Sequence, residues 1–267
     1  MKYITPFFLL LLFSCSGLKY LERKATLLDL KTQYDAVGAT GTFLLHDCVK
    51  NQYFVYNQGN ADSLYSPAST FKIVNSIIAL ETGVVAKITD TTKWDGVIRD
   101  VKEWNKDTDM KSAFKNSTVW YYQSIAKKIG VVKMKKWLDS LSYGANSEIK
   151  TIDKFWLNGE LKISPQQQLE FLERLAKKQL PISSATYEAL EEIMLRDVRG
   201  TDLLFGKTGW GFSTKDIGWF VGYVRTREGV YTFVNFMLAP NADQTKFPSA
   251  RINIAYNVLR NQGIIAL

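Results

Sequence analysis

The chain has 267 residues, of which 46% are hydrophobic and 22% charged, and its 34 basic and 26 acidic side chains give a net charge of +8. This apolar content can bury a full core, which excludes extended disorder, and the length predicts one compact unit. The single histidine excludes a zinc site built from several histidines, so we expect no metal. If the chain is a hydrolase, its general base is therefore expected not to be histidine.

The first residues predict an export signal. Lys2 supplies a positive charge, and residues 7–13 form an apolar run that is too short for the roughly 20 residues of a membrane span. Residues 12–15, Leu-Phe-Ser-Cys, resemble the lipobox of bacterial lipoproteins, although a bulky Phe13 stands where a small residue is usual. We expect residues 1–14 to be a signal peptide and the mature protein to be exported to the periplasm. Lipid anchoring through Cys15 is one outcome, and plain secretion with loss of Cys15 is the other.

Either outcome leaves Cys48 without an intramolecular partner, so we expect no internal disulfide. Residues 41–57 predict two strands joined by a polar turn near residues 47–52, with His46 at the end of the first strand. For His46 a structural role is expected rather than a catalytic one.

The middle of the chain, from Ser66 to about Arg199, is mostly helical by period. Ser164 and Pro165 predict the start of one helix, as cap and first residue. Strands return from Leu203 onward, at 217–224 and 229–238. A last helix is predicted from near Pro248 to Gly263, with an apolar face of Ile252, Ala255, Val258 and Leu259.

Strands at both ends and helices between them predict an α/β (α+β) fold in which one sheet, built from both ends of the chain, surrounds a helical insertion. We expect a single domain over residues 15–267, with a sheet part at about 19–64 plus 203–267 and a helical part at about 65–202. The lysines are scattered as on solvated helix faces, so no nucleic-acid partner is expected. The sequence sets no oligomeric state.

The spacing Ser-x-x-Lys places a hydroxyl and an amine on one helix face, where the amine can take the serine's proton without a histidine. The pattern occurs at Ser16, Ser69, Ser112, Ser124 and Ser147. Only Ser69 lies at a helix start, which we predict from Ser66 as the cap and Pro67 in the first turn. An oxyanion formed there would face the positive end of the helix dipole.

The helix after Ser69 is apolar around nearly its whole circumference, so it is predicted to be buried. Lys72 then lies in a low dielectric, where an unpaired ammonium is strongly disfavoured. It should lose its proton, find an anion or be chemically modified. A structural buried lysine with an acidic partner and a catalytic lysine remain open alternatives on this evidence alone.

Lys207-Thr208-Gly209 stands at the start of a strand pattern. The nearby Gly200 and Gly206 do not form a P-loop, because five residues separate them and a strand follows where a helix is needed. A lysine and a hydroxyl on an edge strand suit a substrate that carries a carboxylate. An ordinary turn is the alternative.

Three motifs together resemble those of the penicillin-recognising serine enzymes, in the same order: Ser69-Thr70-Phe71-Lys72, Ser117-Thr118-Val119 and Lys207-Thr208-Gly209. The middle motif in the form Ser-x-Val is similar to that of the class D (oxacillinase-type) β-lactamases. Further matches are Pro67-Ala68, Trp104, the run Asp153 to Leu157, and Arg251 at the start of the last helix. The resemblance covers essentially the whole mature chain.

It implies a β-lactamase/transpeptidase-like fold, with a central antiparallel sheet flanked by N- and C-terminal helices and an inserted all-helical subdomain. The implied activity is hydrolysis of β-lactams through an acyl-enzyme on Ser69. Lys72, carbamylated by carbon dioxide or bicarbonate, would be the base in both steps, with no diffusible cofactor. The resemblance also implies that Ser117 relays a proton with support from Lys207, and that Thr208 and Arg251 bind the substrate carboxylate. The backbone N–H groups of Ser69 and Trp210 would form the oxyanion hole. The pocket walls would be Phe71, Trp104, Val119 and Trp156, and the indole N–H of Trp156 would hold the carbamate.

One departure concerns the loop before the tryptophan. The family usually has Tyr-Gly-Asn there, whereas this chain has Tyr143-Gly144-Ala145 with Asn146 one step later. This puts the loop geometry and the substrate spectrum in doubt rather than the reaction. Two alternatives share the motifs: a penicillin-responsive sensor domain that stays acylated, which normally follows several membrane spans, and a D,D-transpeptidase or carboxypeptidase, which Val119 disfavours.

Overall fold

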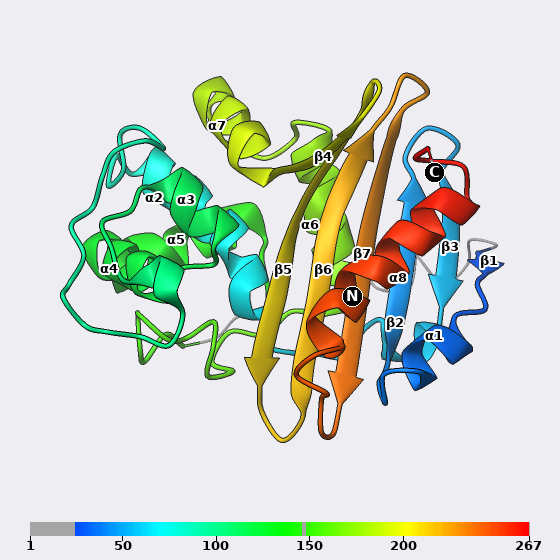
Figure 1. The fold of residues 1–267 in the computed structure, drawn as a ribbon. Coiled ribbons are helices and arrows are strands. Elements are labelled where there is room, and N and C mark those ends of the chain that lie inside the picture. Colours follow the sequence, from blue (N-terminus) through cyan, green and yellow to red (C-terminus); the bar gives the residue numbers. More distant parts are fainter. Residues whose placement is uncertain (1–24, 146–147, 267) are drawn as a thin grey trace, which may run out of the picture.

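The structure is a computed structural model that describes residues 25–145 and 148–266. Seven strands form one sheet in the order β1-β3-β2-β7-β6-β5-β4 (Figure 1). They are β1 (Thr26–Leu27), β2 (Thr40–Asp47), β3 (Gln52–Tyr56), β4 (Leu195–Arg199), β5 (Asp202–Phe212), β6 (Asp216–Arg225) and β7 (Val230–Ala239). All neighbours are antiparallel except β1 and β3, which are parallel. The sheet built from both ends of the chain is thus confirmed, because β2 pairs with β7 along its whole length.

Two layers of helices cover the sheet. The helices α1 (Lys31–Asp35) and α8 (Phe247–Asn261) pack on one face, around a core that includes Tyr34, Phe220 and Phe233. The other face packs against the helical region and α6 (Pro165–Ala176). Figure 1 shows α8 crossing the strands on the near side while α6 lies behind them.

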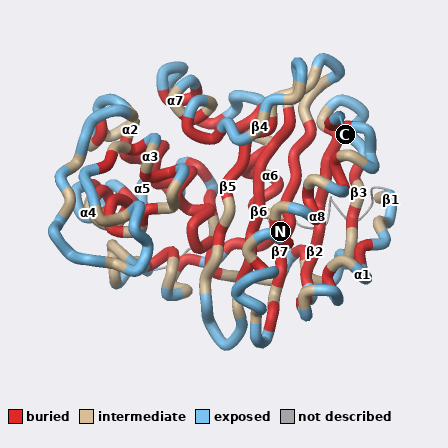
Figure 2. Tube along the Cα trace, in the orientation of Figure 1, coloured by how far each residue is buried: buried red, intermediate tan, exposed pale blue. Residues whose placement is uncertain are grey.

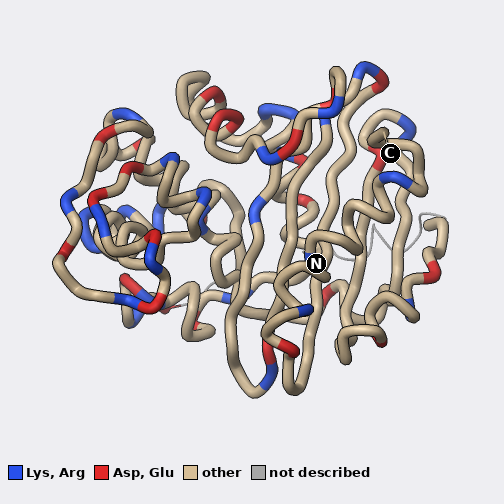
Figure 3. Tube along the Cα trace, viewed as in Figure 1, with Lys and Arg blue, Asp and Glu red and all other residues tan. Residues whose placement is uncertain are grey.

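The helical region lies beside the β5 side of the sheet (Figure 1). It contains α2 (Lys72–Glu81), α3 (Met110–Lys115), α4 (Val119–Ile129), α5 (Val131–Leu141) and α7 (Ser184–Met194), with the short 3-10 turns η2 (Ala68–Phe71) and η3 (Lys102–Trp104). A further 3-10 turn, η1 (Gln58–Asn60), follows β3 and packs on β2. Figure 2 shows the buried positions gathered between these helices and the strands, and Figure 3 shows basic and acidic residues interspersed along the outer segments.

Local sequence signals explain several of these elements. The prediction for α6 is confirmed: the Ser164 hydroxyl accepts from the Gln167 N–H, the Gln167 side chain accepts from the Ser164 N–H, and Pro165 opens the helix. The helix α2 is also buried as its apolar circumference predicts, since every residue from Lys72 to Ala79 is buried.

Three expectations need correction. The helical stretch ends at Met194, because Leu195–Arg199 turns back at Gly200 to pair with β5 as an edge strand. In the last helix Ile254 packs in the core where Ile252 was expected, and Ile252 is only partly buried. Ser66 does not cap the helix after it, as its hydroxyl bonds the Trp156 carbonyl instead, at 2.7 Å.

Candidate active site

Ser69 lies in the 3-10 turn η2, three residues before the α-helix α2 begins at Lys72. The Lys72 Nζ donates a hydrogen bond of 2.9 Å to the Ser69 Oγ, so the serine and the lysine meet as their spacing predicts. Ala68, just before the serine, has a left-handed φ of 48°. A non-glycine residue in this region costs roughly 1–3 kcal/mol, and such strain concentrates at functional sites. Ser69 therefore lies in a strained 3-10 turn, where the sequence predicted the capped first turn of an α-helix.

Lys72 is 1% exposed, and its amine faces the ring of Tyr122 at 5.4 Å from the centroid. Burial lowers the pKa of Lys72 from 10.5 to about 7. No acidic side chain forms an ion pair with it among the described residues. The alternative of a structural lysine with an acidic partner is therefore not what the structure shows, and a neutral amine can accept the proton of Ser69.

Aromatic rings close this pocket. Trp156 is fully buried and stacks on Phe71, the neighbour of Lys72, with 5.3 Å between ring centroids. The Trp156 carbonyl accepts from the Ser66 hydroxyl and from the Ala68 N–H, at 2.7 and 3.1 Å. These two bonds fix the tryptophan against the turn that carries Ser69. Its own indole N–H is buried without a hydrogen-bond partner in the described part of the chain.

Strand β5 borders the Ser69 turn on the other side. β4 pairs with β5 only between Asp202 and Phe205. Among the described residues no strand pairs with that edge of β5 from Gly206 onward, and η2 packs there. A Cβ on Gly209 would meet the Thr70 side chain at 3.1 Å and the Pro67 carbonyl at 3.2 Å. The glycine of the Lys207-Thr208-Gly209 motif thus favours the close approach of the strand to the serine's turn, because a side chain here would push these neighbours back by a few tenths of an ångström.

The second serine of the motif set meets the second lysine. Ser117 has a left-handed φ of 53° just before α4, and the buried Lys207 Nζ donates to its Oγ at 2.5 Å. Burial, followed by repulsion from Lys72, Arg196 and Arg251, holds the pKa of Lys207 well below its usual range. Lys72 and Lys207 thus share one electrostatic environment, although they come from opposite sides of the pocket.

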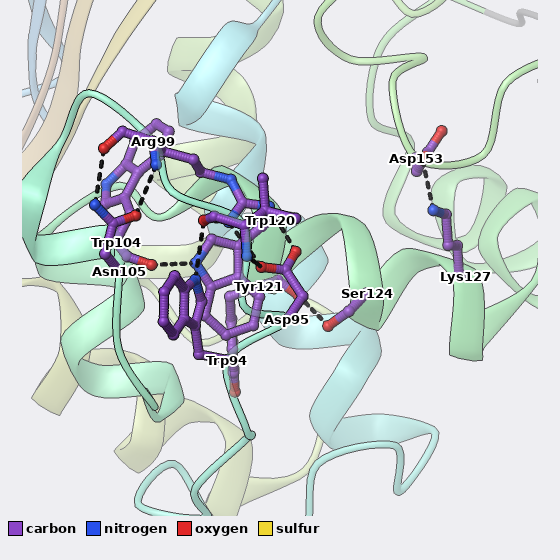
Figure 4. Close-up of polar contacts among 11 residues, drawn as sticks. Trp94, Asp95, Arg99, Trp104, Asn105, Trp120, Tyr121, Ser124, Lys127 and Asp153 are labelled. Atoms are coloured by element: carbon purple, nitrogen blue, oxygen red, sulfur yellow. Dashed lines mark hydrogen bonds and ion pairs between the residues drawn. The ribbon is translucent and has the colours of Figure 1, made fainter.

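The loop before Ser117 is held by its own polar contacts (Figure 4). Arg99 forms a double hydrogen bond with Asp95, at 2.6 and 2.8 Å, and exchanges backbone-to-amide bonds with Asn105. Trp104 then donates its indole N–H to the carbonyl of Asn116, at 3.0 Å. Trp104 thus fixes the backbone next to Ser117.

The remaining predicted residues fall into two groups. Val119 is the half-buried first residue of α4, two positions after Ser117. On the face of β5 opposite to Lys207, Trp210 lies beneath Arg251, whose guanidinium is 5.4 Å from the ring centroid. Thr208 shares this face because alternate residues of a strand point to the same side. Arg251 is 8% exposed, donates to the Gly209 carbonyl at 2.5 Å, and has its pKa lowered to about 10 by burial and then by Arg196.

The other Ser-x-x-Lys pairs differ from Ser69 and Lys72 in exposure. Lys115 and Lys127 are exposed, and Lys127 forms an ion pair with Asp153 that joins α4 to the tryptophan loop (Figure 4). The pairs at Ser16 and Ser147 lie wholly or partly outside the described residues, as do Cys15 and Asn146. Ala145 retains a loop role, since its N–H bonds the Lys162 carbonyl at 2.9 Å.

Sequence reasoning missed two contributors. Tyr122 lies on α4, 50 positions from Lys72 along the chain, and its helix period indicates only that it is buried. Arg196 was assigned to a helix but sits on β4, from where it repels Lys207 and Arg251. The sequence around Arg196 shows no pattern that would place this residue near the pocket.

The assembled residues place a serine hydroxyl against a buried lysine amine, beside an open strand edge. The model of the penicillin binding protein transpeptidase domain matches residues 30–260. A probable beta-lactamase YbxI of Bacillus subtilis (strain 168) is 40% identical over 84% of this chain and 82% of its own. The crystal structure of a class D beta lactamase YbXI from Nostoc covers 89% of this chain and 100% of its own at 40% identity, with a TM-score of 0.83.

The chain therefore belongs to the penicillin-binding protein transpeptidase family and, within it, to the class D β-lactamase enzymes. The regulatory protein BlaR1 of Bacillus licheniformis is also similar, at 31% identity over 88% of this chain, which spans 39% of that protein. Within residues 25–145 and 148–266, no helix is long and apolar enough to cross a membrane.

Proposed function

We propose that this chain hydrolyses β-lactam antibiotics through an acyl-enzyme on Ser69, with Lys72 carbamylated as the general base for acylation and deacylation. The observation that carries the proposal is the hydrogen bond from the Lys72 amine to the Ser69 hydroxyl inside a pocket that has no acidic partner for the lysine in the described residues. Membership of the class D β-lactamases supports the reaction.

The pocket fits a carbamate on Lys72. An amine with its pKa lowered to about 7 is substantially neutral at pH 7 to 8, and only a neutral amine adds to carbon dioxide. The buried indole N–H of Trp156 is a free donor for an anionic oxygen. The carbamate would supply an anionic oxygen base where the unmodified lysine supplies a neutral nitrogen.

In acylation the Ser69 Oγ bonds to the β-lactam carbonyl carbon and gives its proton to the base at Lys72. The carbonyl oxygen, as it becomes an anion, accepts from the backbone N–H groups of Ser69 and Trp210. The ring C–N bond then breaks, and the leaving nitrogen takes a proton through Ser117, to which Lys207 donates a hydrogen bond. Water, deprotonated at Lys72, releases the product and restores Ser69.

Recognition of the substrate carboxylate falls to Thr208 and Arg251. Arg251 uses Nη1 for the Gly209 carbonyl and Nε for the Pro248 carbonyl, which leaves further guanidinium donors for an anion. These two contacts hold the guanidinium beside the β5 edge, so it is oriented before the substrate arrives. We infer that Arg251 captures substrate and takes no part in proton transfer.

The BlaR1 relative favours a second candidate, a sensor that remains acylated. The lifetime of the acyl-enzyme separates the two. The test is mass spectrometry of the protein after mixing with a penicillin, sampled from milliseconds to hours. Rapid return to the free mass with release of hydrolysed product supports the enzyme, and an adduct that persists for hours supports the sensor.

The carbamate has a test of its own. Carbon-13 NMR of protein given labelled bicarbonate should show one signal that Lys72→Ala removes, and activity in degassed buffer should rise when bicarbonate is added. Full activity without carbon dioxide and no such signal would leave a neutral Lys72 as the base.

We also propose that the mature protein is exported to the periplasm and anchored there by lipid on Cys15. Two acyl chains give stable anchoring where one is marginal. The native protein should then partition into detergent, and Cys15→Ala should release it. A native protein cleaved beyond Cys15 would refute the anchor and leave the catalytic proposal intact.

A further inference from the structure

A second group of chemically active side chains lies where the end of β2 meets α6. His46 is near the end of β2, Cys48 follows it in the turn to β3, and Glu173 comes from the last part of α6. One ligand atom from each of these residues lies within 4.8 Å of the other two. His46 is 2% exposed, the Glu173 side chain is 17% exposed, and Cys48 is a partly buried free cysteine. None of the three takes part in the proposed catalysis.

The two distances that meet at His46 match the edges of a tetrahedral zinc site. The His46 Nδ1 is 3.2 Å from the Glu173 Oε2 and 3.7 Å from the Cys48 Sγ. Zinc bonds of about 2.0–2.2 Å to nitrogen and oxygen and about 2.3 Å to sulfur give tetrahedral edges of about 3.4 and 3.6 Å. Both edges at His46 therefore match within tenths of an ångström, and the third edge, from Cys48 to Glu173, is within 4.8 Å. Rotation of the Cys48 and Glu173 side chains would close that edge around one ion, with water as the fourth ligand.

Partners behind these atoms already orient them as the partners of metal ligands do. The His46 Nε2 is 3.2 Å from the Asn51 Oδ1, so its N–H can donate there and leave the lone pair on Nδ1. The ring is fixed by parallel stacking on Tyr53, its cross-strand neighbour, at 4.0 Å and 3°. The second oxygen of Glu173 accepts from Lys177 at 2.6 Å, which leaves Oε2 to face the histidine.

We propose that His46, Cys48 and Glu173 bind one Zn²⁺ ion, which ties α6 to the turn between β2 and β3. The absence of further histidines, from which the sequence predicted no metal, does not exclude this mixed nitrogen, sulfur and oxygen set. The site is independent of the β-lactam reaction and adds a structural function to the chain. The competing state is a metal-free ion pair between protonated His46 and Glu173. Burial lowers the pKa of His46, but the hydrogen bonds to Cys48 and Glu173 outweigh burial and raise this pKa to about 9.

The test uses the mature protein with Cys15→Ala, so that Cys48 is the sole thiol. Protein stripped with a chelator is dialysed against Zn²⁺ or Co²⁺, and the bound metal is measured by atomic absorption and by the optical spectrum. We expect one ion per chain and, with Co²⁺, a thiolate-to-metal charge-transfer band. Cys48→Ser should remove the band and raise the dissociation constant at least about tenfold. Glu192→Gln, a carboxylate paired with Lys111 elsewhere on the surface, is the matched control and should change neither.

Uptake well below one ion per chain, no charge-transfer band, or equal affinity in Cys48→Ser would each overturn the proposal. The spectrum of the unmutated site decides the question even if a variant fails to fold. Hydrolysis of a chromogenic cephalosporin is measured on the same samples, where Cys48→Ser should keep full activity. A failure of the zinc site then shows in the metal content and spectrum, and a failure of the proposed β-lactamase activity shows in the hydrolysis.

Discussion

Replacing Lys72 by Met should abolish activity and at the same time stabilise the fold. Methionine keeps a long unbranched chain in the pocket and removes the amine that burial penalises. The pKa of Lys72 is lowered from 10.5 to about 7 by burial, and each pKa unit corresponds to about 1.4 kcal/mol. The unfolded chain therefore holds this proton more tightly than the folded one, which destabilises the folded state by about 5 kcal/mol below pH 7.

The sign of the pH dependence follows from the same linkage. Between pH 7 and 10.5 the unfolded state binds more protons than the folded state, so the free energy of unfolding of the unmutated protein rises with pH. The penalty falls to about 2 kcal/mol at pH 9 and disappears above 10.5. The apolar gain from methionine does not depend on pH. The stability advantage of Lys72→Met should hence be about 3 kcal/mol larger at pH 6 than at pH 9.

The assay is urea unfolding of both proteins at pH 6 and pH 9 in buffer freed of carbon dioxide. Lys115→Met is the matched control, because Lys115 has the same Ser-x-x-Lys spacing but is exposed. It should show no such difference between the two pH values. An advantage of Lys72→Met that is the same at both would refute the claim that the amine is held in a dry pocket.

Three further predictions concern the reaction. Ser69→Ala should abolish covalent labelling by a fluorescent penicillin, whereas Ser124→Ala, whose hydroxyl bonds the Tyr121 carbonyl, should label normally. Trp156→Phe, which keeps the stacking but removes the N–H, should weaken the carbamate by about ten- to a hundredfold and make turnover depend on added bicarbonate. Trp94→Phe, which removes an indole N–H bonded to a surface-loop carbonyl, should leave bicarbonate dependence unchanged. Arg251→Ala should lower kcat/KM for carboxylate-bearing β-lactams by roughly ten- to a hundredfold and change acyl-enzyme hydrolysis less, and an unchanged kcat/KM would assign the carboxylate to another cation.

Much of the fold follows from local patterns in the sequence. The apolar circumference of α2 predicts burial, and burial of the helix predicts the displaced pKa of Lys72. The long apolar strands β6 and β7 are buried over nearly their whole length, so their pattern is unambiguous. The capping box at Ser164 locates the start of α6 within one residue. In each case the signal lies within one segment of the chain.

The elements that were misassigned depend on contacts between distant segments. β4 is an edge strand with exposed and half-buried positions, so its residues show no apolar alternation. The hydrophobic periodicity of the sequence therefore assigned them to the preceding helical region. Serine is a common helix-capping residue, but the hydroxyl of Ser66 donates to the Trp156 carbonyl, 90 positions away, instead of capping the helix. The meeting of Ser117 with Lys207 is equally nonlocal, and only the order of three motifs indicated it.

In the proposed reaction Lys72 has to act as a base, whereas Lys207 has to carry a positive charge. A carbamate on Lys72 would meet both requirements. With Lys72 as an amine, any charge on it adds to the repulsion that, after burial, lowers the pKa of Lys207. An anion at the same position would reverse this contribution and favour a protonated Lys207. Lys207 would then carry a positive charge beside Ser117, where the leaving nitrogen needs a proton and the substrate brings a carboxylate. The modification would therefore supply the base at Ser69 and also raise the pKa of the lysine on the opposite wall, so loss of carbon dioxide should weaken substrate capture as well as slow deacylation.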